Sequence, residues 1–446
     1  MTQEKQSTTT TFTVATYTDE AIAALSRRWG EPDWMRELRL ESWRVFQETP
    51  RPTLQDEPWR RTDIRHLDLA AIAPTEAGGS LDDLPSDWAA LMEDPDVGGT
   101  LLHVNAVTVH QALADELAAQ GVIFAPMGQA VREHPDLLRR TFMTQAVVPA
   151  DGYFAALHGA LWRGGTFLYV PRNVEVPLPL RAVTWATSGQ STFTHTLVVV
   201  EPGGRVTFVD EYGSQTEEGM TMHNGVVELI LHDGAQLDYV NLQDWGRHVY
   251  QFTHERALVG RDATLHWVLG GMGSKLTKSF LDATLAGPGA TALMSGVYFA
   301  DDRQHLDFDT QQNHLAPNTT SDLLYKGALR DQARTVWQGM IKVFPGAQKT
   351  DGYQANRNLV LNRGARADSI PGLEIEADDV RCTHGSTAGP IDPEQLFYLM
   401  SRGLREMEAK QIIVEGFFTP VLERIPLESV RRQLEEAIRA KSVRSP

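Results

Sequence analysis

A single cysteine and a nearby histidine are the residues of this sequence best suited to bind a metal. Cys382 and His384 lie two positions apart, between an acidic pair, Asp378 and Asp379, and a stretch rich in Gly, Ser and Thr. On an extended strand, residues two apart point to the same side, so the thiol and the imidazole would share a face. Thiolate and imidazole ligands suit iron, copper or zinc. Two ligands make only half a site, so the others would have to come from another chain.

Two other interpretations of this pair stay open. Free cysteines are commonly buried, so Cys382 can be a packing residue beside a surface histidine. A nucleophilic cysteine–histidine dyad is less favoured, because strand neighbours seldom provide the in-line geometry that such catalysis needs.

A second polar cluster lies in the segment HLDFDTQQNH, residues 305–314. On a strand, His305, Asp307 and Asp309 would share one face and could bind a divalent metal. The two aspartates could also act as the paired carboxylates of a glycosidase, which makes a β-helical carbohydrate-active enzyme the alternative function. The more common explanation of such a pattern is the polar outer face of a strand.

The glycine-rich run GGMGSK, residues 270–275, lacks the spacing of a phosphate-binding P-loop. We expect a corner between strands there and no nucleotide hydrolysis by this chain alone.

Composition and charge narrow the class of protein. The 446 residues are 42% hydrophobic and 22% charged, as in ordinary soluble proteins. The net charge of −17 argues against nucleic-acid binding. No apolar run approaches the roughly 20 residues of a membrane span, and the first residues lack the apolar core of a secretory signal. One cysteine excludes an internal disulfide framework and fits a reducing cytoplasm, where we expect the protein.

The sequence pattern in the first third of the chain predicts mainly helical structure. Residues 1–15 are rich in Thr, Gln and Ser and are predicted to be disordered. Residues 16–150 are predicted to form a mostly helical domain, with helices at residues 18–46, 110–119 and 128–142.

From residue 151 the pattern changes to short strands separated by small turns. Turns of similar chemistry begin at residues 202, 232, 260, 287 and 316, which are 27 to 30 residues apart, and further turns follow at about half that interval. A β-sandwich would also give short strands and glycine turns. The regular spacing favours a stacked solenoid, so we predict a parallel β-helix over residues 151–391.

Residues 392–446 predict a C-terminal helical domain. Asp392 is a candidate N-cap, followed by Pro393 at the first helical position. Apolar periodicity predicts helices at residues 395–402, 404–417 and 427–440, which would cover part of the solenoid.

The chain resembles the SufB/SufD family of iron–sulfur cluster assembly proteins, specifically its SufD branch. The resemblance covers nearly the whole chain. It is carried by PDWMRELRLESWRVFQ and PTLQDEPWRRTDIRHLDL near the start, by ALWRGGTFLYVPRNVEVPLPL in the middle, and most specifically by AQKTDGYQANRNLVLN and ADDVRCTHGSTAGPIDPEQLFYLMSRGL.

The resemblance implies a right-handed parallel β-helix between helical N-terminal and C-terminal regions. It also implies a heterodimer with a SufB-like paralogue, in which each chain binds one SufC-type ATPase, here between about Pro393 and Phe418. Such a complex is a scaffold on which a nascent iron–sulfur cluster is built. The resemblance therefore implies a non-catalytic subunit that binds no cofactor stably, with a nascent cluster or iron present only in the complex. His384 would match the family's ligand to iron or cluster near the SufB interface, and Cys382 would match the neighbouring cysteine.

Two departures from the SufB branch support this assignment. SufB-like chains have a glutamate where this chain has Gly385, and they carry additional cysteines. The chain is therefore expected to be the supporting subunit. A parallel solenoid also exposes edge strands, so the isolated chain could form a homodimer.

Overall fold

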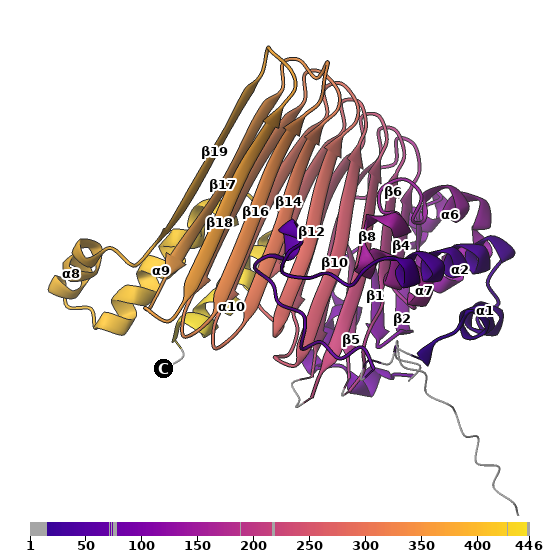
Figure 1. Cartoon of the computed structure of the whole chain (residues 1–446), viewed down its shortest axis with the longest axis horizontal. Coiled ribbons are helices and arrows are strands. Elements are labelled where there is room, and N and C mark those ends of the chain that lie inside the picture. Colours follow the sequence, from indigo (N-terminus) through magenta and orange to yellow (C-terminus); the bar gives the residue numbers. More distant parts are fainter. Residues whose placement is uncertain are drawn as a thin grey trace, which may run out of the picture.

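The computed structural model describes residues 16–443, apart from 71, 73, 75–77, 188, 216–218 and 426. The predicted disordered segment, residues 1–15, lies outside these described residues. The described chain forms one sheet of ten strands and one of nine, with helices on their outer faces (Figure 1). The predicted mainly β fold with helical caps is confirmed.

Successive strands from β4 (Thr166–Val170) onward alternate between the two sheets. The ten-stranded sheet contains, in spatial order, β19 (Arg381–Gly389), β17 (Asp351–Val360), β15 (Thr320–Leu329), β13 (Thr291–Ala300), β11 (Thr264–Gly271), β9 (Gln236–Asp244), β7 (Arg205–Ser214), β5 (Leu180–Ala186), β1 (Gly99–Val104) and β2 (Val107–Leu113). The nine-stranded sheet contains β18 (Arg366–Ile375), β16 (Arg334–Val343), β14 (His305–His314), β12 (Leu276–Leu285), β10 (Val249–Val259), β8 (Thr221–Leu231), β6 (His195–Val200), β4 (Thr166–Val170) and β3 (Ile123–Pro126).

Each strand from β4 to β19 pairs in parallel with the strand two positions earlier or later in the chain. β12 and β14, for example, pair residue for residue from Leu276 opposite His305 to Leu285 opposite His314. The chain therefore winds from one sheet to the other and back, which is the predicted β-solenoid. Each turn of the solenoid has two corners, so the turns seen in the sequence at half the main interval belong to the second corner.

The corners explain why glycine, aspartate and asparagine recur in the turns. At equivalent corners Gly203, Gly234, Asp262, Gly289 and Asn318 have φ between +54° and +77°. Glycine adopts this left-handed backbone freely, and Asp and Asn tolerate it better than most residues. The backbone N–H of each of these residues donates to a carbonyl in the next turn, for example Gly203 to Asp233 at 3.0 Å. The turn chemistry therefore also joins successive turns.

Alternating side chains fill the space between the sheets. Leu306 and Phe308 of β14 and Trp337 of β16 belong to one buried cluster that runs through the solenoid. Asp307 and Asp309, which alternate with them, point to the outer face. The interior is therefore a packed core.

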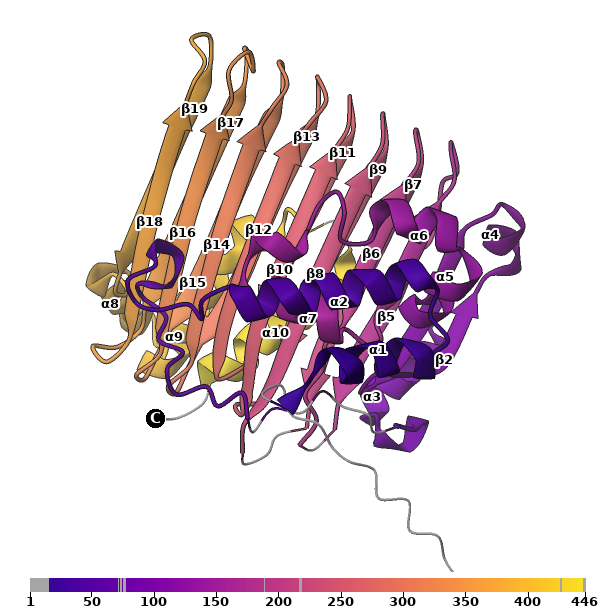
Figure 2. The ribbon, with the colours of Figure 1, turned by 45° about the vertical axis from the view of Figure 1, so that its right-hand side comes forward.

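Helices α1 (Asp19–Arg28), α2 (Asp33–Glu48) and α7 (Tyr153–Leu161) cover the outer face of the nine-stranded sheet (Figure 2). Phe154 of α7 stacks on Phe252 of β10, with ring centroids 3.9 Å apart. After α2, residues 49–69, here named the strap, cross the same face toward β16 and β18 (Figure 2). The N-terminal part of the chain is thus packed along the solenoid.

Two helix predictions in this part need correction. Residues 110–119 are not one helix: residues up to Leu113 form β2, which pairs antiparallel with β1, and only α4 (Asp115–Ala119) is helical. Pairing with a distant strand overrode the local helix preference. Residues 128–142 form two helices, α5 (Met127–Glu133) and α6 (Pro135–Thr141), because proline begins the second one. The sheets also begin upstream of residue 151, at β1.

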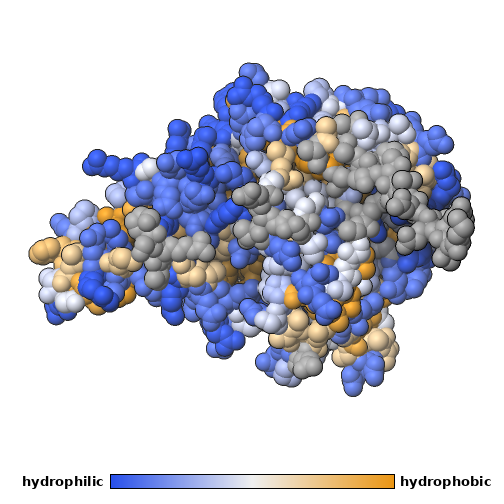
Figure 3. Space-filling model, turned by 90° about the horizontal axis from the view of Figure 1, so that it is seen from below, coloured by the Kyte–Doolittle hydropathy of each residue, from blue (hydrophilic) through white to orange (hydrophobic). Residues whose placement is uncertain are grey.

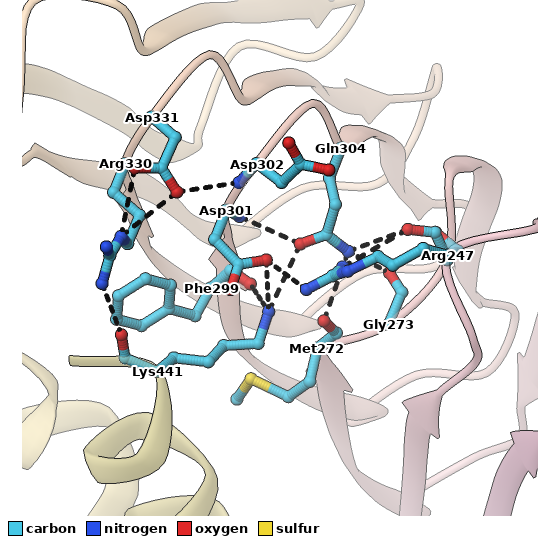
Figure 4. Close-up of polar contacts among 11 residues, drawn as sticks. Arg247, Met272, Gly273, Phe299, Asp301, Asp302, Gln304, Arg330, Asp331 and Lys441 are labelled. Atoms are coloured by element: carbon cyan, nitrogen blue, oxygen red, sulfur yellow. Dashed lines mark hydrogen bonds and ion pairs between the residues drawn. The ribbon is translucent and has the colours of Figure 1, made fainter. Parts of the chain in front are cut away.

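At the other end of the chain, α9 (Glu406–Leu422) and α10 (Glu428–Val443) pack on the outer face of the ten-stranded sheet, and α8 (Pro393–Ser401) projects from it (Figure 1). Lys441 of α10 reaches into the solenoid corner at Asp301 (Figure 4). Its ammonium donates to the carbonyl of Phe299 at 2.8 Å and to Gln304 Oε1 at 3.3 Å. These contacts fix α10 to the sheet.

The two ends of the solenoid differ. At the N-terminal end the antiparallel pairs β1–β2 and β3–β4 end the sheets beside helices. At the C-terminal end the sheets end in β18 and β19, which pair in parallel with β16 and β17. β18 and β19 are largely exposed, in contrast to the buried strands before them. The C-terminal end of the solenoid is therefore open.

Candidate functional site

The open end of the solenoid, here named the mouth, is formed by β18 and β19. Leu373 and Ile375 of β18 pair with Ile341 and Val343 of β16, which are fully buried between the sheets. Paired residues of parallel strands point the same way, so Leu373 and Ile375 also face the interior. They are nevertheless 36% and 42% exposed. The mouth thus exposes apolar side chains that a further turn of solenoid would cover.

Cys382 lies on the opposite lip of the mouth, on β19. It pairs with Gly352, and a Cβ on that glycine would lie 3.2 Å from the sulfur. The side chain is half-buried against the apolar cluster of Ile341, Val343 and Ala347. Burial raises the pKa of the Cys382 thiol, and the N–H of Gly352 acts in the opposite direction. The thiol is therefore protonated at neutral pH and would lose its proton on binding a metal.

His384 lies two residues further along β19, beside Gln354. Gln354 is fully buried and donates to the carbonyl of Gly372 on β18 at 2.8 Å, so this position faces the mouth. The His384 side chain is exposed and makes no hydrogen bond or ion pair with another described residue. Cys382 and His384 thus share one face of an edge strand, with an accessible imidazole beside a half-buried thiol.

The second polar cluster is an anchoring point. Asp307 Oδ2 and Asp309 Oδ2 lie 3.0 Å and 2.9 Å from the ammonium nitrogen of Lys278, which is fully buried. Thr62 of the strap donates to Asp307 and lies 2.8 Å from His305 Nε2. Burial raises the pKa of Asp309 to about 7, against the opposing effect of Lys278. Lys278 and Thr62 of the strap are therefore the observed partners of Asp307.

Among the described residues, no group of three or more His, Cys, Asp or Glu side chains is placed to hold a metal ion. A metal at the mouth would need ligands beyond those that this part of the chain assembles. In the same described part, no helix is both long and apolar enough to cross a membrane.

The glycine-rich run at residues 270–275 ends β11 and forms the corner before β12, in agreement with the expected corner. Gly273 lies against the backbone of Trp245, where a Cβ would meet the nitrogen at 2.0 Å. Close packing between turns accounts for this glycine.

The C-terminal helices expose a second apolar surface. Phe397, Tyr398 and Met400 of α8 are 74%, 56% and 42% exposed, and Met407 of α9 is 53% exposed. Figure 3 shows hydrophobic residues on this projecting part. Isolated exposed apolar residues are common, and larger exposed apolar patches are typical of interaction sites. The apolar face of residues 395–402 was visible in the sequence, whereas the exposure of Leu373 and Ile375 became clear only because β18 is the last strand of its sheet.

Comparison with known proteins agrees with this architecture. Residues 183–417 match the model of the SUF system FeS cluster assembly, SufBD core domain, and residues 98–182 match the SufBD protein N-terminal region. The iron–sulfur cluster assembly protein SufD of Bacillus subtilis is 33% identical over 95% of this chain and 97% of that protein. A SufBD family protein of Staphylococcus saprophyticus is 32% identical, and SufB of Bacillus subtilis is 30% identical, each over 92% of this chain and 90% of the relative. The chain belongs to the SufBD family of iron–sulfur cluster assembly proteins and is a homologue of SufD.

Proposed function

We propose that this chain is a non-catalytic scaffold subunit of a cytoplasmic SUF complex, in which its mouth pairs with a SufB-like paralogue. The observation that carries the proposal is the mouth itself: two exposed edge strands around apolar side chains and an accessible histidine. Edge strands offer unpaired backbone N–H and C=O groups that bind another strand by continuing the sheet. A related solenoid end would supply such strands and cover Leu373 and Ile375.

The nascent cluster, or iron on its way to it, would be cargo at this interface. His384 would donate an imidazole, and Cys382 would contribute a thiolate once a metal displaces its proton. The remaining ligands would come from the partner, because the described residues bring no group of three or more metal-binding side chains together. A site divided between two chains forms only when they pair.

A SufC-like ATPase would dock on α8 and α9, between about Pro393 and Phe418. The exposed Phe397, Tyr398 and Met407 support this proposal, since aromatic side chains and methionine are enriched in protein interfaces. The absence of a P-loop pattern in the sequence fits an ATPase supplied by another chain. The isolated chain could pair with a second copy of itself through the same edges.

The test is co-purification of this chain with a SufB-like and a SufC-like protein, followed by anaerobic reconstitution and measurement of iron and sulfide. His384→Ala should leave the complex assembled and lower its iron content. His232→Ala is the matched control, because His232 is exposed at a solenoid corner outside the mouth. Equal iron in the His384 variant and the control would show that the cluster ligands lie on the partner. Failure of the three chains to associate would overturn the proposed complex.

A further inference from the structure

Three buried polar side chains form a continuous chain beneath the N-terminal helices. His158 of α7, His195 of β6 and Glu228 of β8 have no exposed surface. His158 Nε2 lies 3.1 Å from His195 Nδ1, and His195 Nε2 lies 3.1 Å from Glu228 Oε2. At the other end, His158 Nδ1 lies 3.1 Å from the backbone carbonyl of Asn224. The chain thus connects the helical layer to the outer face of the nine-stranded sheet.

The contact between His158 and the Asn224 carbonyl determines which atom donates in each hydrogen bond of this series. The Asn224 carbonyl only accepts hydrogen bonds, so His158 must carry its proton on Nδ1. A neutral His158 then accepts at Nε2, which requires the proton of His195 to be on Nδ1. His195 Nε2 is left as an acceptor facing Glu228. The third hydrogen bond therefore forms only if the carboxyl of Glu228 is protonated.

Reversing the two imidazoles does not remove this requirement. If the carboxylate were ionised and both histidines carried their protons on Nε2, then His158 Nδ1 would face the Asn224 carbonyl with two acceptors 3.1 Å apart. The three hydrogen bonds need three protons, whereas two neutral imidazoles supply only two. A third proton on His195 would make an imidazolium–carboxylate pair with no exposed surface on either side chain, and burying two charges costs more than burying the neutral pair.

The groups around Glu228 act on its pKa in opposite directions, and their net effect favours the protonated carboxyl. Glu228 also accepts the backbone N–H groups of Met143 at 2.7 Å and Val147 at 3.1 Å, which favour its ionised form. Burial outweighs them and, with a contribution from Asp151, raises the pKa of Glu228 to about 8. Arg256 lies nearby, but it is paired with Asp151 at 2.7 Å and Asp282 at 2.9 Å.

The histidines are held neutral by their surroundings. Burial lowers the pKa of both His158 and His195 well below the usual value, and His223 and His254, which face His158, act in the same direction. The ring of Phe142 from the helical layer stacks on His195 at 3.9 Å and excludes water from it.

We propose that Glu228 carries a proton in the folded protein at neutral pH, and that the chain His158–His195–Glu228 is a pH-sensitive latch between α7 and the sheet. When Glu228 loses that proton at alkaline pH, its carboxylate faces His195 Nε2, and both groups are then hydrogen-bond acceptors. This contact is lost, which weakens the attachment of α7 to the sheet. The latch lies far in the sequence from the mouth, and the proposal does not depend on the proposed scaffold function.

The first test compares folding equilibria of the full chain and Glu228→Gln from pH 6.5 to 9. A group that holds its proton only when folded strengthens folding below about pH 8 and loses this effect as the pH rises toward that value. Relative to the variant, the folding equilibrium constant of the wild type should fall about tenfold per pH unit between pH 6.5 and 8 and level off above. The control Glu201→Gln, at the end of β6, should keep the wild-type pH dependence. Parallel curves for wild type and Glu228→Gln would overturn the proposal.

A second test needs no substitution and so does not depend on the variant folding. Nitrogen NMR of histidine-labelled wild-type protein at pH 7 should show His158 and His195 neutral, with the proton on Nδ1 in both. An imidazolium signal from either ring, or a proton on Nε2, would place the shared proton elsewhere and overturn the assignment to Glu228.

Discussion

Lys278 lies between two carboxylates of the neighbouring strand, with its ammonium nitrogen 3.0 Å from Asp307 and 2.9 Å from Asp309. The lysine and Asp307 have no exposed side-chain surface. Thr62 of the strap donates to the same Asp307, so this ion cluster attaches the N-terminal segment to the sheet.

Removal of this lysine should be strongly destabilising. Lys278→Met would leave two carboxylates without their cation, and breaking a buried ion pair costs about 3–5 kcal/mol. Urea unfolding would measure the loss. Lys342→Met provides the control, because Lys342 forms a surface pair with Glu374 and its loss should leave stability near that of the wild type. Similar stabilities for both variants would refute the anchoring role of Lys278.

A charge in the mouth should prevent pairing without unfolding the chain. Ile375→Asp replaces a 42% exposed apolar side chain at the end of β18 by a carboxylate that pairing would bury. Co-purification with a SufB-like chain should be lost while the urea midpoint stays unchanged. Leu315→Asp, at a 44% exposed position on a solenoid corner, should pair normally. Retained pairing of Ile375→Asp would mean that the interface lies elsewhere.

Truncation of the exposed aromatic side chain of Phe397 on α8 should weaken binding of a different partner, the SufC-like ATPase. Phe397→Ala removes a 74% exposed ring that makes no contribution to the buried clusters of the described chain. Binding of a SufC-like ATPase should weaken about tenfold or more, since buried aromatic anchors often contribute over 1 kcal/mol to an interface. Titration calorimetry would measure this, and pairing through the mouth should be unaffected. An unchanged affinity for the ATPase would exclude α8 from the docking surface.

Acid should weaken the fold through buried neutral histidines. His314 bonds Thr319 and Ser321, and burial lowers its pKa to about 4. Between pH 6.5 and 4 the unfolded chain binds a proton that the folded chain does not, so stability is full above pH 6.5 and falls with decreasing pH. At pH 5 this group alone should cost roughly 2 kcal/mol relative to pH 7.

The substitution His314→Gln isolates that contribution. The glutamine can bond hydroxyl groups but cannot titrate, so the loss of stability between pH 7 and 5 should be smaller by that amount. An identical loss in wild type and variant would show that His314 protonates equally in both states.

Local chemistry made the solenoid predictable. Glycine, aspartate and asparagine recur at the five equivalent corners where the backbone is left-handed, and their regular spacing can be seen in the sequence whatever the strands contain. The strand carrying Cys382 and His384 was predictable for the same reason, because the turns before it fix its place. Their proposed role as ligands stays a prediction.

The parts that escaped prediction depend on contacts between distant segments. Residues 110–113 became a strand because β1 lies beside them, which no local propensity encodes. His305, Asp307 and Asp309 share a face as predicted, but Lys278 and Thr62, which determine what that face does, come from other segments. The protonated state of Glu228 follows only from the order of three hydrogen bonds across α7, β6 and β8.

The difference between the two ends of the solenoid has a consequence for the size of the assembly. Stacked turns could in principle be extended without limit, and at five equivalent corners a backbone N–H donates to a carbonyl of the next turn. Among the described residues, the parallel stacking ends at β18 and β19, whereas antiparallel pairs end the sheets at the other end. If two chains pair through the end formed by β18 and β19, each uses its single parallel end, so such a contact would give closed pairs and would not propagate into a fibre.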